Sequence, residues 1–236
     1  TPGDVHVAPQ MPAPIDGTLR QFALRVPSVI DECSGIMVFG KRIKSLVFST
    51  DVAIIKNINA DAVIAVYPFT PQQIIADAIV STSSLPVFCG VGGGTTTGAR
   101  VVMLAKDAEA FGAMAVVVNA PTTNDVIAQI ADIIDIPIVV TVLDENTDID
   151  ARLEAGATIF NVSAAARTPE VVRILRERYP DLPIIATGGP SQESIRETVA
   201  AGANAISFTP PTAEELFHGL MTRYRNEHES KTKGEA

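Results

Sequence analysis

The chain alternates between short aliphatic runs and longer amphipathic stretches. Four of the runs follow a glycine or another small residue, as Ala-Gly-Ala-Thr does at 155–158. A glycine at such a point ends a helix in the left-handed conformation, and a strand follows at once. The pattern therefore predicts four strands that each follow a helix. They cover residues 63–67, 116–119, 159–163 and 205–209.

A second set of aliphatic runs opens with proline and alternates with the first set. Proline is tolerated at the first residue of a strand, because its missing N–H matters least there. These strands are predicted at 86–89, 137–141 and 183–187, and the run 45–50 adds an eighth. Amphipathic helices are predicted between strands and after the last one, at 71–81, 99–111, 125–134, 169–179, 193–201 and 213–225.

Eight strands that alternate with helices imply a parallel sheet, and eight is the number that closes such a sheet. We therefore predict the α/β class and a (β/α)8 TIM barrel. The alternative, an open doubly wound sheet, rarely repeats so evenly over eight units. Residues 26–43 are predicted to form an extra N-terminal helix that caps the bottom of the barrel. We expect an extension at 1–23, one barrel domain at 24–225 and a polar tail at 226–236.

Composition agrees with this architecture. The 236 residues are 47% hydrophobic and include no Trp, so the core must be aliphatic. Many buried parallel strands have this composition, because both of their faces are covered. A barrel of this kind usually needs about 250 residues in one domain.

The formal net charge of −9 excludes two classes of partner. An acidic chain repels nucleic acid phosphates and anionic membranes. The two cysteines lie far apart and form no CxxC pair, which indicates a reducing compartment. With no apolar signal core, we expect a cytoplasmic protein. A mean hydropathy of +0.26 favours a homo-oligomer, with the apolar segment 26–39 as a buried or interface element.

In barrels of this type the active site lies where the strands run into the following loops. The residues at those predicted strand ends are polar, and they form our first set of candidates. They are Ser49, Asp51, Tyr67, Cys89, Asn119, Thr141, Asn161, Ser163, Ser207 and Thr209.

Four of these candidates have side chains that could take part in catalysis. Asp51 is the best general acid or base, although an N-cap role is equally plausible. Tyr67 either hydrogen-bonds a ligand or packs across the mouth, and Cys89 is either a nucleophile or a small buried apolar residue. Asn161 is informative because a buried amide must find partners. No lysine or histidine stands at these ends, so we expect no Schiff-base chemistry, no metal and no cofactor.

Two glycine-rich turns are candidates for binding an anion through backbone N–H groups. The first is the 90–98 loop, where glycines and threonines precede a helix N-terminus. Its candidates are Gly90, Gly92, Gly93, Gly94 and Thr95. The second is the 187–189 turn, formed by Thr187, Gly188 and Gly189. At the next strand end Pro210 and Pro211 remove two N–H donors, which weakens a phosphate site there. The alternative for the 90–98 loop is a tight turn that needs positive φ.

The order of motifs from 86 to 211 resembles that of the 2-keto-3-deoxy-phosphogluconate aldolases and the wider phosphate-binding barrels. Gly90-Val91-Gly92 matches the family's Gly-x-Gly turn after the third strand. The segment 119–125 is similar to its asparagine-rich turn with a carboxylate, and 187–189 to its Thr-Gly-Gly at the seventh strand. The resemblance covers a little over half of the chain and implies a phosphate-binding barrel.

In the same alignment, the catalytic residues of the aldolases are absent from this chain. The family's Schiff-base lysine falls on Asn161, its catalytic glutamate near Ala65 and the following arginine near Phe69. The Gly-Ser that grips phosphate after the last strand is replaced by Thr209-Pro210-Pro211. We therefore expect a small-molecule enzyme of lyase, isomerase or hydrolase type that acts on a phosphorylated or carboxylated metabolite without a Schiff base. The alternative is a catalytically silent ligand-binding or regulatory barrel.

Overall fold

The computed structural model describes residues 10–15, 17–20 and 23–234, and it confirms the closed eight-stranded barrel. The strands are parallel and follow the order β10-β3-β4-β5-β6-β7-β8-β9 around the ring. Their bounds are β3 Ser45–Phe48, β4 Ala62–Ala65, β5 Val87–Gly92, β6 Ala115–Val118, β7 Ile138–Val142, β8 Ile159–Val162, β9 Ile184–Thr187 and β10 Ala205–Phe208.

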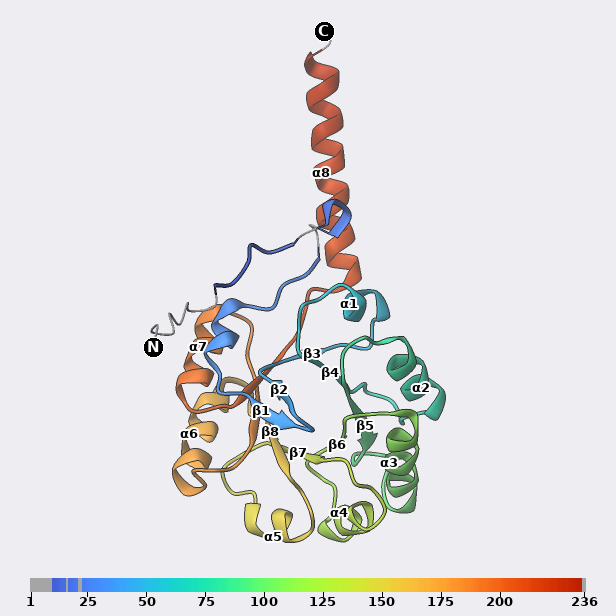
Figure 1. The fold of residues 1–236 in the computed structure, drawn as a ribbon, viewed down its shortest axis with the longest axis vertical. Helices are drawn as coiled ribbons and strands as arrows, with labels where there is room; N and C mark the ends of the chain where they lie inside the picture. The colour runs from blue at the N-terminus through green and yellow to red at the C-terminus, as the bar shows by residue number, and fades with distance from the viewer. Residues whose placement is uncertain (1–9, 16, 21–22, 235–236) are drawn as a thin grey trace, which may run out of the picture.

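Helices surround the barrel, as Figure 1 shows, and lie close to where the hydrophobic pattern predicts them. Asp51, Asp148 and Ser191 cap three of them by accepting hydrogen bonds from backbone N–H groups of the first turn. The bounds are α1 Val52–Lys56, α2 Gln73–Thr82, α3 Ala99–Phe111, α4 Asn124–Ala131, α5 Ile149–Glu154, α6 Thr168–Arg178, α7 Gln192–Ala200 and α8 Ala213–Gly234. A 3-10 turn, η3 (Ala165–Arg167), leads into α6.

Two apolar clusters show which way each strand residue points. The inner cluster fills the barrel and includes Leu46, Ile64, Phe88, Val139 and Ile185. The outer cluster contains the intervening strand residues and packs against the helices. Since successive side chains of a strand point to opposite faces, membership of the inner cluster fixes the inward register of every strand.

Residues 26–43 do not form the predicted helix. They form a 3-10 helix, η2 (Ser28–Glu32), and an antiparallel hairpin of β1 (Ile36–Val38) and β2 (Lys41–Ile43). Phe39 and Gly40 both have positive φ and make the two-residue turn that joins the strands.

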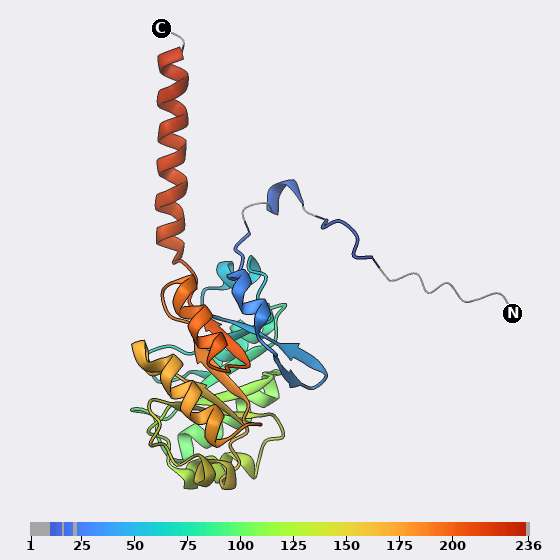
Figure 2. The ribbon, with the colours of Figure 1, turned by 90° about the vertical axis from the view of Figure 1, so that its left-hand side faces the viewer.

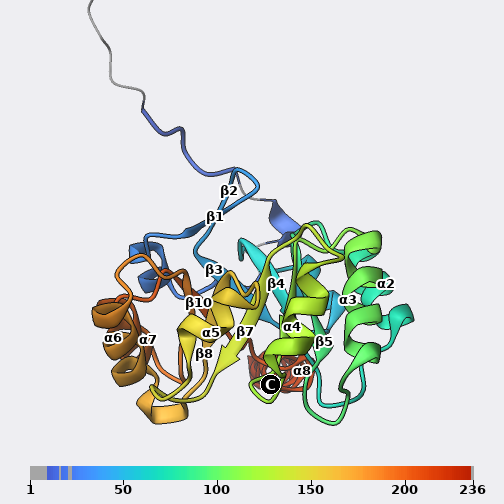
Figure 3. The ribbon, with the colours of Figure 1, turned by 90° about the horizontal axis from the view of Figure 1, so that it is seen from below.

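The hairpin nevertheless performs the predicted capping. Ile36, Val38 and Ile43 are buried in the inner cluster together with residues at the N-terminal ends of the strands. The hairpin lies across the barrel opening in Figure 1 and at one end of the barrel in Figure 3. The bottom of the barrel is therefore closed by a two-stranded plug.

Residues 24–33 close the ring of helices between α1 and α7. The Leu24 N–H donates to Asn57 O at 2.8 Å, just after α1. At the other end, η2 packs against α7 and buries Val29, Ile30 and Cys33 in the outer cluster. This segment occupies the place beside α7 that a helix following the last strand would fill in a regular (β/α)8 ring.

Helix α8 accordingly projects away from the barrel, as Figures 1 and 2 show. It continues to Gly234, so the boundary predicted between the barrel at 225 and a polar tail at 226 falls inside a helix. Most of the predicted extension at 1–23 lies outside the described residues; its described part includes a 3-10 turn, η1 (Thr18–Arg20). No helix in the described part is long and apolar enough to cross a membrane.

Candidate functional site

The inward positions at the C-terminal strand ends change from apolar to polar along one side of the mouth. Val117, Val139, Ile159, Ile185 and Ala205 belong to the inner cluster. The residue two positions further along each of these strands faces inward as well. These residues form a polar arc over five neighbouring strands, β6 to β10: Asn119, Thr141, Asn161, Thr187 and Ser207.

Asn161 is the member of this arc whose hydrogen bonding is incomplete. Its Oδ1 is buried and accepts no hydrogen bond from any described residue. Thr141 lies beside it in the β7–β8 register. A buried acceptor without a partner costs about 1–3 kcal/mol, so the site favours a ligand with a donor group at this position.

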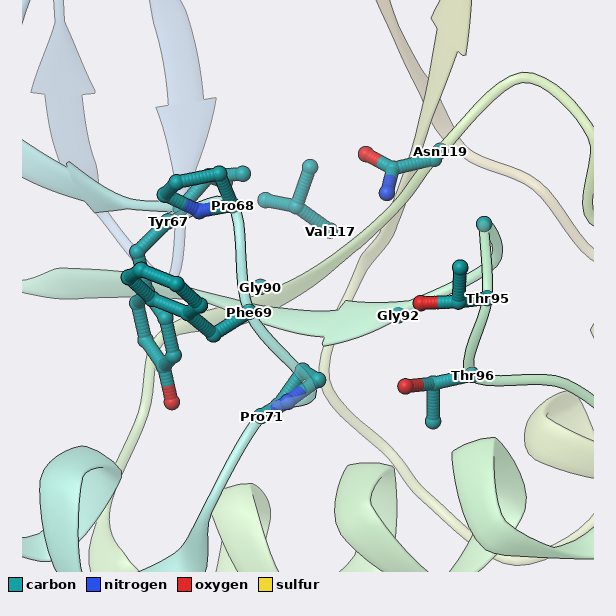
Figure 4. Close-up of a pocket in the computed structure, with 12 residues that line it drawn as sticks. Tyr67, Pro68, Phe69, Pro71, Gly90, Gly92, Thr95, Thr96, Val117 and Asn119 are labelled. Carbon is teal, nitrogen blue, oxygen red and sulfur yellow. The ribbon is translucent and has the colours of Figure 1, made fainter.

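A pocket of about 200 Å³ opens at the same mouth on the side of β4, β5 and β6. Figure 4 shows its shape: Tyr67, Pro68, Phe69 and Pro71 form one wall, and Thr95, Thr96 and Asn119 lie opposite. Gly90 and Gly92 line it without side chains between them and the space. Of the predicted candidates, the pocket brings together Tyr67, Gly90, Gly92, Gly94, Thr95 and Asn119.

The 90–98 loop is held in shape by its own backbone. The Gly93 N–H donates to Thr96 O at 2.8 Å, and the Asn119 N–H donates to Gly92 O at 2.9 Å. Gly92 and Gly93 have φ values of 119° and 105°, which favour glycine. A Cβ on Gly93 would overlap the Thr122 hydroxyl, so this glycine is required by packing as well as by its backbone angle.

Several N–H groups of the loop are left for a ligand. Among the described residues, the N–H groups of Gly94 and Thr95 have no hydrogen-bond acceptor, and both residues line the pocket. Thr96 is buried, and its hydroxyl donates to the hydroxyl of Thr70 at 3.1 Å. The loop thus presents backbone donors to the pocket while its side-chain contacts keep it in place.

The 187–189 turn is built differently. The Gly188 N–H donates to Ser207 O at 3.1 Å and is not free for an anion. A Cβ on Gly188 would lie 2.8 Å from Ile206 Cγ2 and 2.9 Å from Ile195 Cγ1. Gly188 therefore permits close contact between β10 and α7. Gly189, with φ of 78°, completes the turn.

Asp51 caps a helix in the structure. Its Oδ1 accepts hydrogen bonds from Ala53 N at 2.8 Å and Ile54 N at 3.3 Å, while its own N–H donates to Ser49 Oγ. It does not line the pocket. The carboxylate already has a structural task, and a catalytic role for it stays a prediction.

Cys89 does not lie in the pocket either. It follows Phe88 of the inner cluster and points outward, where it is buried in the outer cluster. Burial raises the pKa of its thiol from 9.0 to about 12. A thiol that stays protonated and faces the helices does not fit the predicted role of nucleophile.

Tyr67 is the one ionisable side chain among the pocket-lining residues. Its hydroxyl accepts a hydrogen bond from the Gln72 N–H at 3.0 Å and, in Figure 4, lies on the side of its ring away from Thr95 and Thr96. Sequence reasoning missed Phe69, Pro71 and Thr96 as pocket residues. The run of aromatic residues and prolines directly after the β4 strand was the available signal for the first two.

The carboxylates beyond β7 have hydrogen-bond partners within the protein. Glu145 accepts a hydrogen bond from Arg167 at 2.8 Å, which lowers the pKa of its carboxyl group. Asp144 accepts from the Asn146 N–H at 2.8 Å. Among the described residues there is no group of three or more His, Cys, Asp or Glu side chains that could hold a metal ion.

Comparison with known proteins shows the fold and a short sequence likeness. No family model matches the chain. Over 93 residues the chain is 28% identical to a thiamine-phosphate synthase of Oceanobacillus iheyensis. This match covers 39% of the chain and 39% of that protein, so the chain spans about two fifths of the length of the curated relative it matches.

Two solved structures share the barrel. The chain superposes on 2,3-dimethylmalate lyase, a member of the PEP mutase/isocitrate lyase superfamily, with a TM-score of 0.57 and 14% identity, covering 92% of this chain and 86% of that one. It superposes on the aldolase QR15 with a TM-score of 0.56 and 15% identity, covering 69% and 87%. At this identity the likeness shows the (β/α)8 fold alone. The predicted resemblance to 2-keto-3-deoxy-phosphogluconate aldolases in particular stays a prediction.

Proposed function

We propose that this chain is a small-molecule enzyme that binds a phosphorylated or carboxylated metabolite in the pocket at the C-terminal mouth. The observation that carries the proposal is the pair of unpartnered N–H groups of Gly94 and Thr95 on the pocket wall. Fixed backbone donors bind an anion without the cost of ordering long side chains. The anion would thus lie at the end of β5.

The names of similar proteins agree with this ligand class. The name thiamine-phosphate synthase contains a phosphate ester, and the name 2,3-dimethylmalate lyase contains a dicarboxylic acid. In the proposed site the polar arc faces the remainder of the ligand, where the Asn161 acceptor favours a hydroxyl or ammonium group.

The chemistry we propose is of lyase, isomerase or hydrolase type and does not use a Schiff base. The lysines of the described part of the chain, 41, 44, 56, 106, 231 and 233, stand on β2, directly before β3, on α1, on α3 and on α8, so none is on a barrel strand. Tyr67 is the proposed proton donor because it is the ionisable residue of the pocket lining, and its hydroxyl would leave the Gln72 N–H to reach the ligand. Asn119 and the loop N–H groups would stabilise developing negative charge.

A second candidate function is a binding or regulatory barrel without catalysis. It is favoured by a specific observation: the pocket lining contains no carboxylate, histidine, lysine or cysteine. Proton transfer usually depends on such groups. The two functions share the anion site and differ in turnover.

A thermal-shift screen with inorganic phosphate, sugar phosphates and keto acids tests both. Ligand binding raises Tm by mass action, and we expect stabilisation by members of this panel. Incubation of each hit and product analysis then separates the enzyme from the silent binder. A panel that leaves Tm unchanged contradicts anion binding, and intact ligands contradict the enzyme.

The variant that localises the site is Gly94→Val. Its backbone angle does not require glycine, and the nearest atom to a new Cβ is Asn119 Nδ2 at 3.8 Å, so the free protein should fold normally. The added side chain would obstruct the N–H groups and weaken ligand binding by about tenfold or more. Thr97→Val, on the exposed part of the same loop outside the pocket, is the matched control and should leave binding unchanged.

A further inference from the structure

Helix α8 buries none of its described side chains, although it carries an apolar face. Phe217 is 65% exposed, Tyr224 49% and Met221 43%. Together with Leu216 and Leu220 these residues recur at spacings of three and four positions and lie on one side of the helix. We call this set the α8 face.

A helix of this composition requires a packing partner. Helical stability in proteins comes mainly from packing of an amphipathic face, and isolated helices are marginal in water. Gly219 lies among these residues along α8 and lowers the stability of the helix by about 1 kcal/mol relative to alanine. The barrel does not supply the partner, because residues 24–33 already close the ring beside α7.

The α8 face borders a groove that the molecule leaves open. The groove has a volume of about 600 Å³ and lies between α8 and α1; its lining includes Leu24, Ile54, Leu216, Leu220 and Tyr224. Apolar residues on both sides of an open groove are typical of a protein–protein contact.

The charges on α8 identify a second α8 as the occupant. Glu214 and Arg225 stand three helical turns apart on the same flank of the α8 face, six positions before and five positions after Leu220, which lies near its centre. Neither side chain has an ion-pair partner among the described residues. When two such helices run antiparallel about a two-fold axis between Gly219 and Leu220, Glu214 of each copy faces Arg225 of the other.

We propose that α8 pairs antiparallel with α8 of a second copy of this chain, about a two-fold axis near Leu220. The pair buries the α8 face of both copies, with Leu216 of each opposite Tyr224 of the other. A contact of this kind is isologous and closes on itself, so it gives a dimer rather than a chain of molecules. The proposed contact lies on α8 and not on residues 26–39, which the sequence suggested as a buried or interface element. Val29, Ile30 and Cys33 of that segment are buried within their own barrel.

Sedimentation equilibrium of the full chain over a range of concentrations tests the pairing. The wild type should sediment at twice the monomer mass of 24.9 kDa. Leu220→Glu places two carboxylates at the axis and should raise the dissociation constant more than about tenfold. Thr222→Glu, on the opposite side of α8, is the matched control and should leave the dimer intact.

Charge reversal tests the antiparallel register. Glu214→Arg and Arg225→Glu should each weaken the dimer by about threefold to tenfold, because each creates two like-charged contacts. The double variant restores opposite charges and should recover the wild-type dissociation constant. Circular dichroism of each variant confirms that the barrel folds.

A wild type that is monomeric at all concentrations overturns the proposal. So does a dimer that Leu220→Glu leaves unchanged, or a double variant as weak as the single ones. None of these readings depends on ligand binding, so the pairing and the proposed function fail separately.

Discussion

The 90–98 loop and the 187–189 turn stand at the same mouth of the barrel, and both are rich in glycine. In the first, Gly94 and Thr95 leave N–H groups without acceptors on a pocket wall. In the second, the Gly188 N–H is paired with Ser207, and the missing Cβ allows β10 and α7 to approach. Gly94 and Gly188 therefore have different uses at one mouth, and the hydrogen bonding of their N–H groups separates them.

The largest expected effect is on stability at the 187–189 turn. Gly188→Val adds a branched side chain where Ile206 and Ile195 already lie within 3 Å of the new Cβ. Overpacking of this kind costs about 1–3 kcal/mol, so urea denaturation should show a loss of this size. Gly94→Val should change the free energy of unfolding by less than about 0.5 kcal/mol. Equal losses in the two variants would remove the distinction between the turns.

The next effect compares two asparagines. Asn161 Oδ1 has no partner in the described part of the chain, whereas Asn204 Oδ1 accepts from the Ile184 N–H at 2.8 Å and from Arg176 at 2.7 Å. Asn161→Leu should therefore stabilise the free protein by about 1 kcal/mol and reduce its stabilisation by ligand. Asn204→Leu should destabilise it by about 1–3 kcal/mol. Denaturation curves with and without ligand measure both; a destabilising Asn161→Leu would mean that its acceptor is satisfied.

The outward direction of Cys89 predicts a smaller, pH-dependent effect. Burial raises the pKa of this thiol from 9.0 to about 12, so above pH 9 the unfolded chain ionises while the folded chain does not. The contribution of Cys89 to the free energy of unfolding should therefore be constant below pH 9 and fall as the pH rises from 9 towards 12. In Cys89→Ala this part of the decline should be absent, and ligand binding at pH 8 should be unchanged. Loss of binding would instead place the thiol in the site.

The smallest expected effect concerns Asp51. Asparagine caps helices about as well as aspartate, so Asp51→Asn should change stability by only a few tenths of a kcal/mol. If the carboxylate serves only α1, turnover of any substrate found in the screen should also be unchanged. A large drop in kcat with unchanged stability would restore Asp51 as the general acid or base.

The sequence was sufficient for the barrel because every strand is a short aliphatic run set off by Gly, Pro or a small residue. It did not settle which candidates face the mouth. Both faces of a barrel strand are buried, so Cys89 and Phe88 look alike in the pattern although they point to opposite sides. The structure supplies the register of each strand. This register points Cys89 towards the helices and places Asn119 and Asn161 at the mouth.

The sequence contained a pattern that indicates the hairpin at 36–43, although we predicted a helix there. Ile36 and Val38 are buried and Met37 is exposed, which is the alternation of a strand, and Gly35 and Gly40 flank it with positive φ. The direction of α8 had no such signal. Its apolar face predicts packing against something, and only the position of residues 24–33 shows that this is not the barrel.

The most direct test of the account is the position of a bound anion in a crystal soaked with inorganic phosphate. We predict density at the end of β5, within hydrogen-bond distance of the Gly94 and Thr95 N–H groups. Density at Gly188 and Gly189 beside the start of α8, with none at the 90–98 loop, would contradict it. The loop would then be only a turn, and the anion site would lie where Pro210 and Pro211 were expected to weaken it.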